Sequence, residues 1–304
     1  MSRIVNGHNA PHAFIEFCED DHYDAGRSDY SATTLINEPK IVRLEKDYPE
    51  LVVDDPFENP FKFLSSNWHE MLSAYQKGPT INEERIFTEI VRPIPETRPV
   101  VISGAMDVQT ITDSTSPDYK KDVVIGDYKM TSVYALKDVT KFEQQLNIYA
   151  YLTEKEKPSY RVTGLEIYAF LRDWKISMSE KLRDYPATPG ITIELELWTY
   201  EERERFIEDR IELHENAKRE LPDCSEEGRW PAGKLYRVFS LNDSHRSKTF
   251  SLKRDANKFI ASLDPVDALM TEVQTTHETY RRCKSYCYFS SICDQWKESQ
   301  ENDA

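Results

Sequence analysis

Asp127 and Lys129 stand two residues apart in the stretch GDYKM, a spacing at which an acid and an amine can act on the same group. Alternate side chains of a β-strand point to the same face, so the two share one side of the strand expected here. A second acid, Asp107, lies in the preceding strand-like stretch SGAMDV. Carboxylates on paired strands can hold Mg²⁺ or Mn²⁺, and a nearby ammonium can stabilise charge that develops on a phosphate. The three residues therefore indicate a metal-dependent phosphodiester hydrolase in which Lys129 lies beside the attacking water.

Other polar residues lie where they would support such a site. Glu89 is in the strand-like stretch RIFTEIV, where Glu83 and Glu84 compete with it, and His69 is in the helix expected before that stretch. The simpler interpretation of His69 is a histidine on a helix surface. For the acids, the simpler interpretation is a solvated strand face with cross-strand ion pairs.

Gln145 and Tyr149 lie four residues apart in the helix expected after Lys129, and therefore share one face of it. A pair of this kind next to the acids strengthens the nuclease interpretation. The alternative for Tyr149 is a place in the core, because aromatic residues at helical spacing usually belong there.

Hydrophobic periodicity and turn residues predict the elements that must position these side chains. The strand-like stretches before and after the polar insert DSTSPDYKK are expected to pair as a long hairpin. An amphipathic helix is expected to follow them. The expected strands are 85–91, 100–111, 122–132, 164–174 and 190–198, and the expected helices are 61–78, 138–155 and 199–221.

Pro222 and Cys224 mark a boundary in the sequence, and residues before position 31 lack sustained periodicity. The elements expected after the boundary are two strands and two helices, at 234–241, 248–252, 254–262 and 266–280. The predicted domains are an irregular N-terminal arm, a catalytic core and a C-terminal subdomain, at 1–30, 31–221 and 222–304.

The bulk composition limits the class of protein. The chain has 304 residues, 39% of them hydrophobic and 31% charged, and a formal charge of −15. A protein that coats DNA non-specifically needs positive charge, so this class is disfavoured; a nuclease is not, because its acids carry negative charge where cations bind. No stretch approaches the ~20 apolar residues that cross a bilayer, and the start lacks the apolar segment of a secretion signal. We expect a cytoplasmic protein with no membrane partner.

Three cysteines near the C-terminus are close enough in sequence to share a metal. Cys283, Cys287 and Cys293 lie within eleven residues. Iron–sulfur clusters and structural Zn²⁺ normally take four ligands, so a fourth is required, and Cys18 and Cys224 remain. In a reducing compartment metal ligation is favoured over disulfides. The alternative is a set of thiols without a metal.

The order of the upstream motifs resembles the RecB-like branch of the PD-(D/E)XK nuclease superfamily, over residues 31–200. The motifs are His69, Glu89, Gly-x-x-Asp at 104–107, Asp-x-Lys at 127–129 and Gln-x-x-x-Tyr at 145–149. The resemblance implies an α/β core, with a mixed sheet flanked by helices, that cleaves DNA with Mg²⁺ or Mn²⁺. The metal ligands it implies are His69, Asp107 and Asp127, with Glu89 or the carbonyl of Tyr128. It also implies that Lys129 assists the water and that Gln145 and Tyr149 lie against the DNA.

Downstream, the chain is similar to nucleases encoded by bacteriophages, often near recombination functions. The similarity is carried by RDWKIS, Tyr185-Pro186, LPDCSEEGRW before YRVF, and the terminal cysteines. It implies an exonuclease in DNA recombination, repair or end processing, with DNA and a recombination or single-strand-binding protein as partners. Related nucleases hold a 4Fe–4S cluster with one distant cysteine and a terminal trio. By this resemblance Cys224 is the preferred fourth ligand, and Zn²⁺ is the alternative metal.

Two other functions are compatible with the sequence. One is a DNA-binding or assembly module of the same fold without activity, against which the intact Asp107, Asp127 and Lys129 argue. The other is a zinc-organised interaction protein that has no role on nucleic acids and is indifferent to Mg²⁺ or Mn²⁺.

Overall fold

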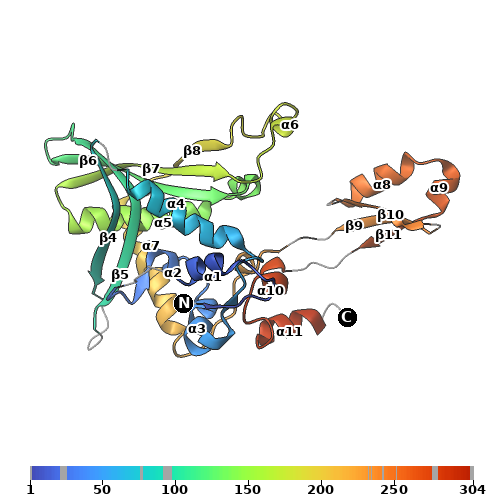
Figure 1. Cartoon of the computed structure of the whole chain (residues 1–304), viewed down its shortest axis with the longest axis horizontal. Helices are drawn as coiled ribbons and strands as arrows, with labels where there is room; N and C mark the ends of the chain where they lie inside the picture. The colour runs from blue at the N-terminus through green and yellow to red at the C-terminus, as the bar shows by residue number, and fades with distance from the viewer. Residues whose placement is uncertain are drawn as a thin grey trace. The chain divides into compact units, whose positions relative to one another are not determined.

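The computed structural model describes the chain except residues 1, 21–25, 76–77, 92–97, 232, 234, 242, 251, 276–279 and 302–304. The side chains of residues 66, 67, 69, 70, 73, 243–246 and 301 are also outside the description. The chain divides into two compact units, Met1–Leu221 and Pro222–Ala304 (Figure 1). In the part that the structure describes, no helix is both long and apolar enough to cross a membrane.

A mixed six-stranded sheet forms the centre of the first unit. Its strands are β2 (Tyr30–Ser31), β4 (Thr80–Ile90), β5 (Val100–Asp113), β6 (Lys121–Thr131), β7 (Tyr160–Leu171) and β8 (Gly190–Leu195). The order is β2-β5-β6-β7-β8, and β4 pairs with β5. β2 is parallel to β5 and β6 is parallel to β7, whereas the other pairs are antiparallel. The expected α/β fold with a mixed sheet flanked by helices is confirmed at this level.

β5 and β6 form the expected long hairpin. Their ladder starts at Asp113 and Lys121, on either side of the polar turn. The Asp122 carboxylate holds the turn by accepting from the Ser114 hydroxyl at 3.0 Å and from the Arg161 guanidinium at 2.9 Å. Burial opposes ionisation of Asp122, but Arg161 has the larger effect and lowers the pKa of the carboxyl.

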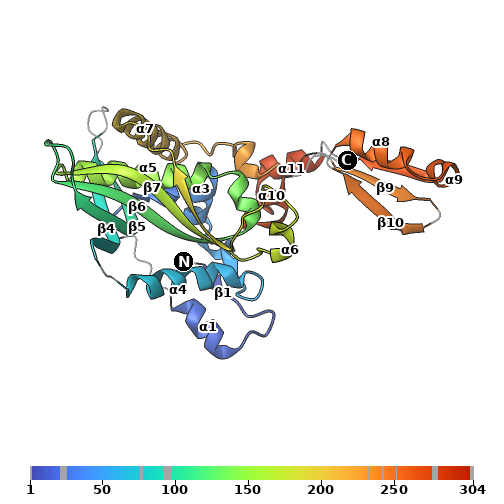
Figure 2. The ribbon, with the colours of Figure 1, turned by 90° about the horizontal axis from the view of Figure 1, so that it is seen from above.

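Helices cover both faces of the sheet. The larger ones are α4 (Pro60–Ser73), α5 (Thr140–Glu156) and α7 (Tyr200–Asn216). Seen from above, α4 and α5 lie on opposite sides of the sheet and α7 lies beyond α5 (Figure 2). α5 was expected to be amphipathic, but its residues 145–153 are all buried, because α7 packs on the side that the sheet leaves open.

α7 begins with a capping box, as its sequence Thr-x-x-Glu suggests. The Thr199 hydroxyl accepts the Glu202 N–H, and the Glu202 carboxylate accepts the Thr199 N–H. Asn147 of α5 ties the preceding segment to the core, because its amide accepts from Trp198 N–H at 2.9 Å and donates to the Glu196 carbonyl at 2.9 Å. A buried amide with these partners fixes where β8 ends and α7 begins.

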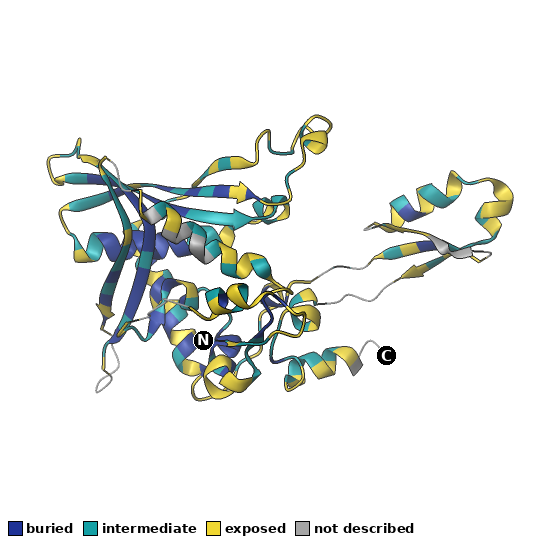
Figure 3. Cartoon of the chain, viewed as in Figure 1, coloured by how far each residue is buried: buried dark blue, intermediate teal, exposed yellow. Residues whose placement is uncertain are grey.

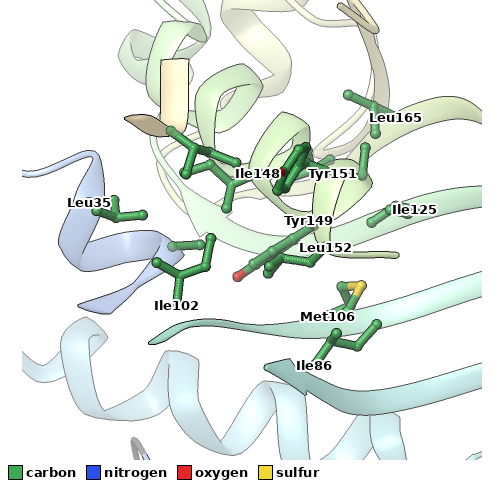
Figure 4. Close-up of a cluster of buried hydrophobic side chains, with 14 of the residues drawn as sticks. Leu35, Ile86, Ile102, Met106, Ile125, Ile148, Tyr149, Tyr151, Leu152 and Leu165 are labelled. Atoms are coloured by element: carbon green, nitrogen blue, oxygen red, sulfur yellow. The ribbon is translucent and has the colours of Figure 1, made fainter. Parts of the chain in front are cut away.

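The core lies between α5 and the central strands, which are dark blue in Figure 3. Ile102 and Met106 of β5, Ile125 of β6, and Ile148 and Leu152 of α5 are almost completely buried. Figure 4 shows Leu152 and the ring of Tyr149 on the side of α5 turned toward Met106.

The N-terminal residues are more regular than predicted. β1 (Arg3–Ile4) pairs in parallel with β3 (Val53–Asp54), and α1 (His12–Glu19) follows it. The rings of Phe14 and Phe17 stack within α1, and Phe14 also contacts Phe57. The prediction of an irregular arm at 1–30 is wrong here because α1 is a short helix whose apolar side packs locally. The remaining elements of this unit are α2 (Ala32–Leu35), α3 (Pro39–Asp47), η1 (Pro49–Leu51), η2 (Val133–Lys137) and α6 (Ile176–Ser179).

The second unit contains a small three-stranded sheet and the cysteine-rich segment. Its elements are η3 (Glu227–Arg229), β9 (Tyr236–Ser240), β10 (Asp243–Phe250), α8 (Lys253–Ala261), α9 (Pro265–Leu269), β11 (Thr271–Thr275), α10 (Arg281–Ser285) and α11 (Asp294–Glu301). The sheet order is β10-β9-β11, all antiparallel. The predicted helix at 266–280 is wrong over Thr271–Thr275, because the alternating Thr-Glu-Val-Gln-Thr forms β11 against β9, and its residues 276–279 lie outside the described residues.

Candidate active site

Strand β5 changes its partner along one edge. Ile102 and Ser103 pair with β2, and residues from Val108 onward pair with β6. In the described part of the sheet, the ladder on this edge is interrupted over residues 104–107, while β4 pairs with residues 104–106 along the opposite edge. β5 and β6 therefore separate at a defined point, which leaves room for side chains between them.

Asp107 and Asp127 lie at this point of separation. Val108 pairs with Gly126, so the two acids are the next residues of their strands beyond the ladder. The Asp107 carboxylate accepts a hydrogen bond from the Tyr128 N–H at 2.7 Å. Beyond the ladder, a side chain of β5 therefore bonds to the backbone of β6 where a backbone carbonyl would otherwise do so. Asp107 is 8% exposed and Asp127 is 1% exposed. The structure thus brings the two predicted acids to one place.

Lys129 lies beside both acids. Its Nζ is 2.5 Å from Oδ2 of Asp127, and about a quarter of its side chain is exposed. Burial lowers the pKa of the Lys129 ammonium, but Asp127 and Asp107 raise it by more, so the net pKa is raised and the group stays charged. Lys129 therefore places a permanent positive charge at the acids, with part of its side chain open to solvent.

Gln145 of α5 contacts Asp127 from the buried side, and Tyr149 contacts Gln145. Nε2 of Gln145 donates to Oδ1 of Asp127 at 3.3 Å and to the Tyr149 hydroxyl at 2.7 Å. Gln145 is 8% exposed and Tyr149 is 4% exposed. Because so little of either side chain is accessible, they orient Asp127 and present almost no surface to a DNA strand. The expected contact of this pair with DNA is therefore replaced by a contact with the acid.

Two glycines of the motifs allow close packing around the acids. A Cβ on Gly104 would lie 2.6 Å from the Tyr149 ring, and one on Gly126 would lie 2.5 Å from the Tyr168 ring. Tyr168 in turn packs against Tyr128, with ring centroids 5.5 Å apart. Burial raises the pKa of the Tyr128 hydroxyl, and the charges of Asp107 and Glu83 raise it further. The Tyr128 hydroxyl therefore lies in the negative field of Asp107 on β5 and Glu83 on β4.

Glu89 does not belong to this group, contrary to prediction. It pairs with Val101, six residues along β5 from Asp107, which is about 20 Å at the rise of a strand. Its side chain is exposed on β4. The sequence does not give the register of β4, and three acids in one strand left the choice between them open.

Glu83, which is exposed, is the acid of β4 that lies level with Asp107. Asn82 pairs with Val108 and Glu84 pairs with Met106, so Glu83 lies opposite Asp107. Its φ of 53° is in the left-handed region, which is uncommon for a residue other than glycine. The third acid of β4, Glu84, is engaged elsewhere, because it forms an ion pair with Lys157 at 2.5 Å. The signal that could have selected Glu83 is the β4–β5 register, which places it level with Asp107.

His69 falls within α4, and its side chain lies outside the described residues. α4 packs on β5 and β6, the two strands that carry the acids. Trp68, the residue before it, packs edge-on against Phe170 of β7 with ring centroids 4.9 Å apart.

The four cysteines proposed to share a metal all lie in the second unit. Burial raises the pKa of the Cys287 thiol; the Phe289 N–H, which donates to this sulfur, and Arg282 lower it, whereas Cys283 and Cys293 raise it. Cys18, the other candidate, is buried in α1 of the first unit, where burial and Glu19 raise the pKa of its thiol.

Cys224 is held beside the terminal cysteines through its backbone. The Gln295 amide accepts the Cys224 N–H at 3.0 Å and donates to the Cys224 carbonyl at 2.9 Å. Gln295 is two residues from Cys293 in sequence. This two-bond contact brings the start of the second unit next to its cysteine-rich end.

None of the five cysteines, all of them within the described residues, forms a disulfide. Over the residues that the structure describes, no three or more His, Cys, Asp or Glu side chains are placed as the ligands of one metal ion. The ligand atoms of the two candidate sites differ in kind. The site at β5 and β6 offers hard carboxylate oxygens, and the one in the second unit offers soft thiols.

The comparisons with known proteins leave the family open. No protein-family model matches the chain, and no curated protein matches it. A solved structure described as "Crystal structure of SSO0001" is similar to it, with a TM-score of 0.42 and 20% sequence identity. The similarity covers 66% of this chain and 83% of that one, and at this level it carries no argument about function.

Proposed function

We propose that this protein is a metal-dependent DNA nuclease with a PD-(D/E)XK core. The observation that carries the proposal is a connected polar group drawn from three elements. Lys129 pairs with Asp127, and Gln145 donates to both Asp127 and Tyr149. Asp107 joins them from β5 through the Tyr128 N–H. Surface ion pairs rarely bring two acids, an amine and a buried amide to the break between two strands, whereas a phosphodiesterase needs such a group.

The donor set fits a hard divalent cation. Mg²⁺ is usually held by one or two carboxylates and completes its shell with water and substrate phosphate, so it does not require three protein acids. In the proposal Asp107 and Asp127 hold Mg²⁺ or Mn²⁺, with His69 and the Tyr128 carbonyl as further ligands. When bound, the cation supplies charge stabilisation at the phosphate and lowers the pKa of a water.

Lys129 orients the attacking water and stabilises the charge that develops on the phosphate. Its ammonium stays protonated beside the acids, so this charge does not depend on a titration near neutral pH. Gln145 and Tyr149 are positioning residues, because they fix the rotamer of Asp127 from inside the core. Glu83 adds a negative charge on the β4 side, next to Asp107.

The cysteines of the second unit are proposed to hold a 4Fe–4S cluster, or Zn²⁺ as the alternative, with Cys224, Cys283, Cys287 and Cys293 as ligands. The donor chemistry supports this, since four thiols match both groups. The Phe289 N–H that donates to the Cys287 sulfur would stabilise a thiolate there. The role of such a centre would be to tie the two ends of the second unit together.

The proposed biological role is exonucleolytic processing of DNA ends in recombination or repair. It rests on the resemblance to phage nucleases given above, as does the expectation of a recombination or single-strand-binding partner.

Cleavage of end-labelled linear DNA and of circular DNA with Mn²⁺ tests the proposal. Asp127→Asn and Lys129→Met should each lower the rate by ~10²–10³-fold, the usual cost of losing a group that acts on the transition state. Asp122→Asn and Lys121→Met, on the same strand but beside the hairpin turn, are the matched controls and should retain activity. Full activity of Lys129→Met would show that the site is misassigned. DNA binding without cleavage by the unmodified protein would favour the inactive module, and zinc without DNA binding would favour the interaction protein.

A further inference from the structure

Trp230 is held at the surface of the second unit in an unusual conformation. Its φ is 58°, a left-handed value that bulky residues rarely adopt, and 40% of the residue is exposed. Two backbone bonds hold it there: its N–H donates to the Glu227 carbonyl at 3.0 Å, and its carbonyl accepts the Arg281 N–H at 3.0 Å. The fold therefore presents an indole ring to solvent and fixes its direction.

A second exposed aromatic ring lies beside it. Tyr286 is 66% exposed, and its ring centroid is 5.6 Å from that of Trp230, with the planes tilted by 58°. The Arg282 guanidinium lies 5.3 Å from the centroid of the Trp230 ring and donates to the Gly228 carbonyl at 3.2 Å. The two rings thus form a small exposed aromatic surface, and the Arg282 guanidinium packs against the Trp230 ring.

The charges around these rings come from two segments: the exposed acids Glu226 and Glu227 precede Trp230, and the basic residues lie in the segment that carries Tyr286. Residues 280–293 contain Arg281, Arg282 and Lys284 and no acid, in a chain whose formal charge is −15. Arg281 and Lys284 are exposed at either end of a single turn of α10. A local concentration of positive charge next to exposed aromatic rings is the chemistry that binds single-stranded nucleic acid, where rings stack on bases and cations contact phosphates.

We propose that Trp230 and Tyr286, together with Arg281 and Lys284, form a contact surface for single-stranded DNA on the second unit. The choice of DNA over RNA rests on the proposed nuclease function, whereas the contact itself does not. An acidic protein would be attracted by the same charges, but it would gain less from two exposed rings that can stack on unpaired bases. Duplex DNA keeps its bases stacked on one another and should gain only from the charges.

Binding of a fluorescent oligo-dT strand by the full-length protein, measured by anisotropy in EDTA, tests the surface without cleavage. Trp230→Leu and Tyr286→Leu should each weaken binding by about fivefold or more, the expected loss of one base–aromatic stack. Lys284→Ala, at an exposed position, should weaken binding and reduce its salt dependence. The matched controls are Tyr119→Leu, an exposed tyrosine beside Arg161 in the first unit, and Lys253→Ala on α8.

The outcomes separate this inference from the proposed function. Loss of oligo-dT binding in the two aromatic variants, with duplex affinity unchanged, supports the surface. It does so even if the unmodified protein cleaves nothing, in which case only the nuclease proposal fails. Wild-type affinity of Trp230→Leu and Tyr286→Leu for oligo-dT would overturn the inference, and so would equal loss on duplex and single strands. Tighter binding to oligo-rU than to oligo-dT would overturn the assignment to DNA. Absence of any nucleic-acid binding would overturn the inference as a whole and would favour a protein partner.

Discussion

At Gly104, strand β5 packs directly against side chains of helix α5. A methyl group there would lie 2.6 Å from the Tyr149 ring and 2.8 Å from Leu152. Gly104→Ala should therefore destabilise the protein by about 1–3 kcal/mol, the usual cost of forcing an extra carbon into a packed core. It should also disturb the Gln145 contact with Asp127. Gly164→Ala is the control, because its Cβ would make an ordinary 3.5 Å contact. Equal midpoints of denaturation for the two variants would contradict this account.

Glu83 offers a second test at the residue scale. Removing a charge level with Asp107 should weaken the binding of Mn²⁺ to the acids, and Glu83→Gln should show this as a lower affinity, by about threefold, in calorimetry without DNA. Glu89→Gln is matched in chemistry and strand but lies about 20 Å away, so it should leave the affinity unchanged. Equal affinities in the two variants would remove Glu83 from the site.

Asp107, Asp127 and Lys129 could be predicted from the sequence because the period of two and a short polar insert fix their relative positions. Glu89 was the wrong choice among three acids, since only the pairing of β4 with β5 decides which one faces Asp107. The local environment of Gln145 could not be predicted either. Its burial depends on how α5 packs against β6, where Gln145 contacts Asp127, and this packing is tertiary.

At the scale of elements, His214 connects α7 to α2. Its Nε2 lies 3.1 Å from the Leu35 carbonyl, and the residue is 3% exposed. Burial is the main reason why its pKa is lowered from 6.5 to about 4. His214 of the unfolded chain is therefore protonated below pH 6.5, whereas His214 of the folded chain is protonated only below about pH 4. Stability should be complete above pH 6.5 and fall between pH 6.5 and 4, by up to ~3 kcal/mol.

Denaturant titrations at several pH values check this dependence. His214→Gln keeps a donor for the Leu35 carbonyl but cannot titrate, so its stability should fall less steeply over the same range. His12→Gln removes a histidine whose side chain is 84% exposed, and should leave the slope unchanged. The same slope in wild type and His214→Gln would show that other groups cause the acid sensitivity.

Long periodic stretches of sequence predicted the main elements of the first unit, whereas short stretches gave wrong predictions. The strands of the hairpin and the helices at its sides follow from alternation and helical spacing over ten or more residues. The five residues of β11 were included in a helix because the helical pattern of the preceding residues extends into them. Pairing with β9 overrides that local preference.

At the scale of the whole molecule, the two units predict two thermal transitions that respond to different changes. Cys287→Ser should lower the midpoint of the transition of the second unit, because loss of one ligand weakens the proposed metal centre. Cys18→Ala, in the first unit, should leave that transition and the metal content unchanged. The protein isolated without oxygen should absorb at the blue end of the visible spectrum if the centre is iron–sulfur, and should be colourless with one zinc otherwise. A Cys287→Ser protein with unaltered metal content and melting would refute the centre and leave the carboxylate site untouched.

The isolated bridge between Pro231 and Tyr280 has a topological consequence. These two residues are adjacent in space, and the Arg281 N–H to Trp230 carbonyl bond reinforces the junction. The segment that contains β9, β10 and β11 therefore begins and ends at two neighbouring residues, Pro231 and Tyr280. It is an insertion within the part of the second unit that carries the cysteines. Chain ends that meet in this way tolerate exchange of whatever lies between them. A short Gly-Ser turn that joins Pro231 to Tyr280 in place of the residues between them should give a smaller protein that keeps the Cys224–Gln295 contact.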